Sequence, residues 1–178
     1  IVESKLSNRA TSGAKAAGIW QFIPSTAKLH NLEVDKYVDE RRDPLQATHA
    51  AIDYLERLKD RFGKWYLAIL AYNAGEGKLS KAIKLAGSDD IMVLLNPKKK
   101  YLPLESRDYL RKIIMMAYVA NDSDFLISKD SSMLNSATYI GIKRVEIPGG
   151  TSLRDVAVSI GFSLENLSKY NTHLRYSF

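Results

Sequence analysis

The sequence contains no cysteine among its 178 residues. This absence excludes a disulfide framework, a thiolate zinc site and a cysteine nucleophile. Only three histidines are present, and His30, His49 and His173 are too scattered to indicate a metal cluster. No apolar run approaches the length needed to span a bilayer. The composition, 46% hydrophobic and 26% charged, excludes intrinsic disorder. The sequence therefore predicts one folded domain with a small appendage, and neither a metal nor a cofactor.

Acidic residues are too few to balance the basic ones. Lys and Arg number 26 against 20 Asp and Glu, which gives a net charge of +6. Such a balance suits an anionic partner, whether nucleic acid, phospholipid headgroups or a carboxylate-rich polymer. Lys98–Lys100 is the only run of three basic residues, and elsewhere Lys and Arg are interleaved with Asp and Glu. We therefore interpret most lysines as a solvated surface and expect no nucleic-acid partner.

Residues 1–126 have a helical pattern. Asp43 can cap a helix that starts at Pro44, and apolar residues recur on one face until Gly63 ends it. Residues 64–74 are apolar on nearly every side, which is typical of a buried central helix. A short helix is predicted over 78–86. Ser106 is predicted to cap a last long helix with an apolar stripe through Tyr109, Leu110, Ile113, Ile114, Ala117 and Tyr118.

The pattern changes after residue 126. A Ser/Asp/Lys-rich linker is predicted over 127–137, followed by a module over 138–178. In that module, 139–147 alternates like a strand. Two short amphipathic helices are predicted over Ser152–Ile160 and Ser163–Tyr170. The sequence predicts a mainly α fold with a small α+β module at its C-terminal end.

Three polar residues stand in apolar surroundings. Asn73 ends the apolar segment 64–74, Gln21 lies within Gly18–Pro24, and Glu3 follows Ile1 and Val2. A buried amide needs hydrogen-bond partners or a wetted cleft. Asn73 can therefore satisfy carbonyls at its helix end or bind a ligand, and Gln21 can bond within the core or bind a ligand. The residues alone leave these alternatives open.

Four segments occur together in an order and spacing that resembles a known family. They are Glu3-Ser4, Gly18-Ile19-Trp20-Gln21, Ala71–Gly75 and Leu102–Tyr109. The chain is similar in these segments to the family 1 lytic murein transglycosylases, over residues 1–120. Residues 139–171 resemble a LysM-type module, although the chain ends before a closing strand is recognisable.

The resemblance implies a goose-lysozyme-like (SLT) helical domain over 1–126, followed by a LysM-like module. It implies an enzyme that cleaves the β-1,4 bond between N-acetylmuramic acid and N-acetylglucosamine without water, leaving a 1,6-anhydromuramoyl end. Such a reaction needs one carboxyl group in place of the glycosidases' two. That group must be protonated at the start, so burial has to raise its pKa.

The resemblance also assigns residues to roles. Glu3 matches the catalytic acid and base, while Tyr72 and Tyr109 match aromatic residues of the cleft that could equally be core residues. One departure concerns the loop after Ser12, where Lys15 stands in place of the usual glycine. We expect Gly13 to take the bend there. The matched substrate-binding residues are Ser12, Gln21, Ile23, Tyr72, Asn73 and Tyr109.

By the same resemblance the partner is the glycan strand of peptidoglycan, in the periplasm of a Gram-negative bacterium. An outer-membrane lipid anchor upstream of residue 1 is compatible with it. Two alternatives remain: a hydrolytic lysozyme on the same fold, and a non-catalytic peptidoglycan-binding or scaffold protein. Lys15 is the one feature that favours the scaffold protein.

Overall fold

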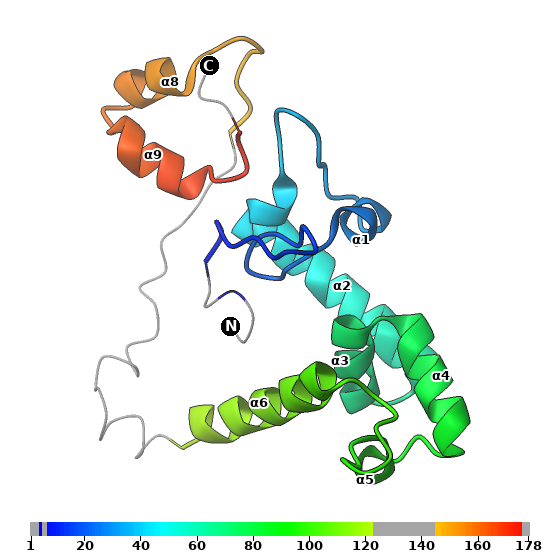
Figure 1. Ribbon diagram of the computed structural model, residues 1–178. Helices are drawn as coiled ribbons and strands as arrows, with labels where there is room; N and C mark the ends of the chain where they lie inside the picture. The colour runs from blue at the N-terminus through cyan, green and yellow to red at the C-terminus, as the bar shows by residue number, and fades with distance from the viewer. Residues whose placement is uncertain (1–3, 5–6, 123–144, 176–178) are drawn as a thin grey trace. The chain divides into compact units, whose positions relative to one another are not determined.

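The computed structural model describes residues 4, 7–122 and 145–175, and it is mainly helical (Figure 1). The chain divides into two compact units, Ile1–Tyr54 with Val145–Phe178, and Leu55–Arg144. The longest helix, α2, begins in the first unit and ends in the second. In chain order the helices are α1 (Pro24–Leu29), the 3₁₀ turn η1 (Glu40–Arg42), α2 (Pro44–Phe62), α3 (Trp65–Ala74), α4 (Glu76–Ala86), α5 (Ile91–Leu94), α6 (Leu104–Ala120), α8 (Leu153–Ser159) and α9 (Leu164–Tyr170).

Helix α3 forms the centre of the second unit. It packs against both α4 and α6, and α4 in turn contacts α5. Its buried residues are Leu67, Ala68, Leu70 and Ala71. The predicted central helix is confirmed, because burial follows from an apolar sequence on nearly every side of the helix. Gly75, with φ of 91°, ends it, since this backbone conformation strongly favours glycine.

The predicted start of α2 is confirmed, but that of α6 is wrong. Asp43 Oδ1 accepts hydrogen bonds from the backbone N–H groups of Leu45 (2.9 Å) and Gln46 (3.1 Å), as an N-cap does. By contrast, α6 begins at Leu104 with Pro103 as its N-cap, and Ser106 is buried within the first turn. The backbone of Pro103 is already fixed for a helix entry, so no serine cap is needed.

Only the first half of the predicted stripe on α6 is covered. Leu110 is fully buried, whereas Ile114 and Tyr118 are 51% and 75% exposed. The apolar stripe is therefore helical along its whole length. In the described part of the chain, however, few residues pack against its second half.

The first unit departs from the helical pattern at its start. Residues 7–22 form turns and isolated bridges, Thr11 with Ala17 and Ala17 with Phe22. The helical prediction is wrong here. Positive φ angles at Lys15, Gly18 and Gln21 interrupt any regular helix.

The C-terminal residues of the first unit contain the two predicted short helices. The hydroxyl groups of Ser152 and Ser163 accept hydrogen bonds from the N–H groups of Asp155 and Asn166, and so cap α8 and α9, which contact each other. Of the predicted strand, 139–144 lies outside the described residues, as does the linker 127–137, and 145–147 is irregular. The described residues include no named strand, so the α+β arrangement of this module stays a prediction.

The segment after α9 is bonded to the residues that precede α2. Leu174 forms a β-bridge with Val38, and the backbone N–H of Asp39 donates to the carbonyl of His173 (2.8 Å). Thr172 Oγ1 donates to the carbonyl of Arg42 (2.7 Å). Within the first unit, the C-terminal module is thus attached to residues 38–42 by backbone and side-chain bonds. No helix in the described ranges is long and apolar enough to cross a membrane.

Candidate functional site

Ser12 lies on the exposed rim of the N-terminal loop, which we define as residues 7–22. Its backbone N–H donates to the carbonyl of Ala16 (2.9 Å), and its Oγ accepts from the N–H of Ala16 (3.1 Å). Within this turn Lys15 has φ of 59°, whereas Gly13 has no positive φ. The expectation that Gly13 takes the bend is therefore wrong. The closed Ser12–Ala16 pair fixes the turn so that the left-handed position falls on Lys15.

Gln21 is half-buried and is held by its own loop. Its Nε2 donates to the carbonyl of Gly18 (2.7 Å), and its backbone φ of 51° turns the chain toward Phe22. Its amide oxygen accepts no hydrogen bond from the described residues. The side chain is thus anchored through its donor end, with its acceptor end available. Ile23 follows in sequence and is 40% exposed.

A buried arginine holds this loop from beneath. Arg41 pairs with Asp39 through two bonds, Nε to Oδ1 at 2.7 Å and Nη2 to Oδ2 at 2.8 Å. Its Nη1 donates to the carbonyls of Lys15 (2.7 Å) and Phe22 (3.0 Å). These bonds join the two ends of the segment that contains Gln21. No role was predicted for Asp39 or Arg41 from the sequence, because a charged pair two residues apart usually lies on the surface.

Two further contacts fix the middle of the loop. Gly18 packs so closely on Arg41 that an added Cβ would lie 1.7 Å from the Arg41 carbonyl oxygen. Trp20 Nε1 donates to Thr48 Oγ1 (2.8 Å), which connects the loop to α2. The segment Gly18–Gln21 is therefore rigid for reasons of backbone contact and side-chain bonding together.

Glu3 lies outside the described residues, so its catalytic role and its burial stay predictions. Ser4, the next residue in sequence, is buried, and its Oγ donates to the carbonyl of Ile19 (2.9 Å). This bond attaches residue 4 to the Gly18–Gln21 segment. No role was predicted for Ser4 from the sequence.

The other predicted site residues lie in the second unit. Tyr72 and Asn73 are half-buried at the end of α3, and Tyr109 is half-buried on α6. Because α3 and α6 pack against each other, these residues belong to one pair of contacting helices. Tyr72, Asn73 and Tyr109 each take part in a polar or ring interaction, so none is an unengaged side chain.

The start of α3 is held by an exposed ion pair. Lys64 Nζ lies 2.8 Å from Asp89 Oδ2, and Tyr66 donates its hydroxyl to the Asp89 carbonyl (3.2 Å). The hydrogen bond from Lys64 lowers the pKa of Asp89, and the same bond raises the pKa of Lys64. Among the described residues, no group of three His, Asp or Glu side chains could hold a metal ion.

Comparison with known proteins identifies the family. Residues 1–94, more than half of the chain, match the transglycosylase SLT domain family. This chain belongs to that family. The matched part of the SLT domain includes Glu3, Ser12, Gln21 and Ile23 together with Tyr72 and Asn73, whereas Tyr109 lies beyond it.

Individual relatives agree with this assignment. The chain is 34% identical over 186 aligned residues to the membrane-bound lytic murein transglycosylase D of Escherichia coli (strain K12), and equally to that of Escherichia coli O6:H1. Each alignment covers 99% of this chain and 38% of the relative. A protein of Alteromonas sp. (strain M-1) named for tributyltin chloride resistance is 39% identical over 84 residues, 47% of this chain and 41% of that protein. The SLT chain therefore spans well under half the length of these relatives.

Proposed function

We propose that this chain is the catalytic part of a lytic transglycosylase that cleaves peptidoglycan between N-acetylmuramic acid and N-acetylglucosamine. The observation that carries the proposal is the SLT match over residues 1–94, which includes every predicted site residue except Tyr109. The names of the Escherichia coli relatives, which are lytic murein transglycosylases, support the same activity.

Glu3 is the proposed acid and base. As a neutral acid it gives its proton to the glycosidic oxygen, and the bond from that oxygen to C1 breaks. As a carboxylate it then takes the proton of the C6 hydroxyl, whose oxygen bonds to C1. The proton count closes without water, so one carboxyl suffices where hydrolases use two.

The anchored Gln21 is the proposed acceptor for a donor group of the sugar. Because its Nε2 is bonded to the Gly18 carbonyl, its free oxygen has a fixed direction. Fixing such a group before the substrate arrives reduces the entropy cost of binding. Exposed Ile23 offers an apolar surface to a sugar face beside it, and exposed Ser12 offers a hydroxyl. Tyr72, Asn73 and Tyr109 are proposed to contact substrate from α3 and α6.

Two alternatives use the same residues. A lysozyme would employ water in place of the C6 hydroxyl, and a scaffold protein would bind without cleaving. Lys15 was the one argument for the scaffold protein. That argument is weakened because the turn at Lys15 is closed by hydrogen bonds to Ser12 and Arg41 with lysine in place.

The C-terminal module is proposed to be LysM-like and to add affinity for peptidoglycan. Its two capped helices, α8 and α9, fit the predicted pattern. A location in the cell envelope, the periplasm, is proposed from the substrate and from the membrane-bound relatives. An outer-membrane anchor would lie upstream of residue 1.

The decisive experiment is digestion of purified sacculi followed by mass spectrometry of the released muropeptides. We expect 1,6-anhydromuramoyl ends, which borohydride does not reduce. Reducible muramic acid ends would indicate a lysozyme. An intact polymer that nevertheless retains the protein would indicate a scaffold protein.

A further inference from the structure

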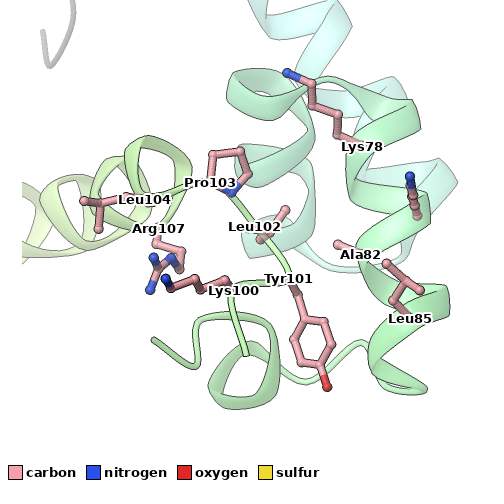
Figure 2. Close-up of a pocket in the computed structure, with 10 residues that line it drawn as sticks. Lys78, Ala82, Leu85, Lys100, Tyr101, Leu102, Pro103, Leu104 and Arg107 are labelled. Carbon is pink, nitrogen blue, oxygen red and sulfur yellow. The ribbon is translucent and has the colours of Figure 1, made fainter. Parts of the chain in front are cut away.

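A cavity of about 600 Å³ lies in the second unit, where α4 faces the start of α6 (Figure 2). Its volume lies within the usual range of small-ligand sites. Four of its lining residues are basic and none is acidic, and most of the others are apolar. The basic residues are Lys78, Lys81, Lys100 and Arg107, and the apolar ones include Ala82, Leu85, Leu102, Pro103 and Leu104.

Arg107 distinguishes this cavity from a solvated basic surface. It is only 6% exposed, and its Nε has no hydrogen-bond partner among the described residues. Figure 2 shows its guanidinium on the same side of the 100–104 segment as the amine of Lys100. A buried charge without a counter-charge is unfavourable, and an anion that entered the cavity would relieve it.

The cavity is separate from the proposed cleft residue on the same helix. Tyr109 is not among its lining residues. An α-helix turns by roughly 100° per residue, so Arg107 and Tyr109 point to opposite sides of α6. The cavity is therefore an additional site rather than part of the Tyr109 surface.

We propose that this cavity binds a carboxylate of a short acidic peptide with small aliphatic side chains. A guanidinium fork matches a planar carboxylate, and the three lysines add attraction at the rim. The exposed apolar lining from Leu85 and Leu104 suits alanine-like side chains better than it suits a bare phosphate. The identity of this peptide rests on the proposed function: in an enzyme that cleaves peptidoglycan, it is the stem peptide of that polymer.

The test measures binding of glycan-free stem peptide to the full chain by calorimetry. Replacing both Lys81 and Lys100 with Gln should weaken binding of the peptide at least about tenfold, as expected for the loss of charge-assisted bonds. Arg107→Lys should weaken it by at least the same factor. Lys84→Gln, on the same helix but outside the cavity, is the matched control and should change binding less than twofold. Amidation of the peptide carboxylates should weaken binding as much as the double variant does.

Several outcomes would overturn the proposal. The first is that the double variant and the Lys84→Gln control bind the peptide equally well. The second is that the chain binds inorganic phosphate or anionic phosphatidylglycerol vesicles but does not bind the peptide. Because Arg107 is buried, a misfolded Arg107→Lys would leave the exposed lysine pair as the deciding variant.

Cleavage of glycan strands that carry no peptide distinguishes a failure of this proposal from a failure of the proposed function. The cavity variants should cleave stripped strands at the wild-type rate. Cleavage of stripped strands without peptide binding would contradict the cavity assignment alone. Peptide binding that depends on the lysines, in a protein that cleaves no strand, would contradict the proposed function alone.

Discussion

Two arginines are buried to the same degree, yet their surroundings differ. Arg41 is 5% exposed and Arg107 is 6% exposed. Arg41 has a carboxylate and two carbonyls around its guanidinium, whereas Nε of Arg107 has no partner among the described residues. The burial of a charge therefore does not by itself reveal its role. A fully bonded guanidinium holds a fold together, and one without its bonds is suited to receive a ligand.

The largest effect is expected where the backbone touches Arg41. Gly18→Ala would place a Cβ 1.7 Å from the Arg41 carbonyl oxygen, in a backbone with φ of 76°. Since backbone must shift to relieve this overlap, we expect a loss of at least about 4 kcal/mol or failure to fold. The measurement is urea unfolding followed by circular dichroism. Gly13→Ala is the control, because a Cβ added there would meet nothing within 4 Å and no positive φ is needed. A fully stable Gly18→Ala would show that this packing is not required.

The next effect compares the arginines directly. Arg41→Met leaves Asp39 buried without its bidentate partner, and we expect a loss of about 3 kcal/mol in the free energy of unfolding. Breaking a buried ion pair costs about 3–5 kcal/mol. We expect the lower value because Arg175 and Arg42, at 3.3 and 3.6 Å from Asp39 Oδ2, still compensate part of the charge of Asp39. Arg107→Met removes no ion pair and should cost less than about 1 kcal/mol. Equal effects of the two substitutions on the urea midpoint would show that the two arginines do not differ in this way.

A smaller effect of opposite sign is expected at Lys15. Its left-handed backbone costs about 1–2 kcal/mol in a non-glycine residue. Lys15→Gly removes that strain but gains freedom in the unfolded chain, so the net stabilisation should be about 0.5 kcal/mol. Arg41 bonds to the backbone carbonyl of Lys15, so this contact survives the substitution. A loss of stability in the same unfolding assay would indicate that the Lys15 side chain contributes to the loop.

The smallest effect concerns the exposed Lys64–Asp89 pair. Because Lys64 lowers the pKa of Asp89 below its ordinary value of 3.8, the pair stabilises the folded state above that pH. The contribution is lost as the pH falls through the lowered value, when Asp89 becomes protonated. We expect Asp89→Asn to have a slightly lower Tm than wild type at pH 7, and we expect this difference in Tm to shrink as the pH falls below 3.8. A difference in Tm that grew toward low pH would contradict this sign.

The sequence predicts the helices of this chain better than its loops. Helix α3 was predictable from its uniform apolarity, α2 from Asp43 and Gly63, and α8 from Ser152, because these signals are local. The N-terminal loop was not predictable. Its shape depends on Arg41 and Gly18, which meet only after the chain has folded. The left-handed turn at Lys15 was missed for another reason, because Gly13 in the same turn was the more favourable residue for a bend.

The cationic cavity was missed for a related reason. Lys78 and Lys81 occur one helical turn apart on α4, and Lys100 ends the only basic run, as exposed lysines often do. What distinguishes them is Arg107, whose burial comes from the packing of α6 rather than from its neighbours in sequence. Arg107 lies in the Leu102–Tyr109 segment and in the first turn of a helix, but neither position indicates that an arginine is buried.

A single carboxyl, that of Glu3, is central to the proposed reaction because it acts as both acid and base. The most direct measurement is the turnover of soluble peptidoglycan strands by Glu3→Gln beside wild type, with binding to sacculi measured on the same samples. An amide of the same shape cannot supply the proton, so we expect turnover to fall by at least about 10²–10⁴-fold with binding unchanged. Turnover at half the wild-type rate or more, in a folded Glu3→Gln protein, would contradict this role of Glu3.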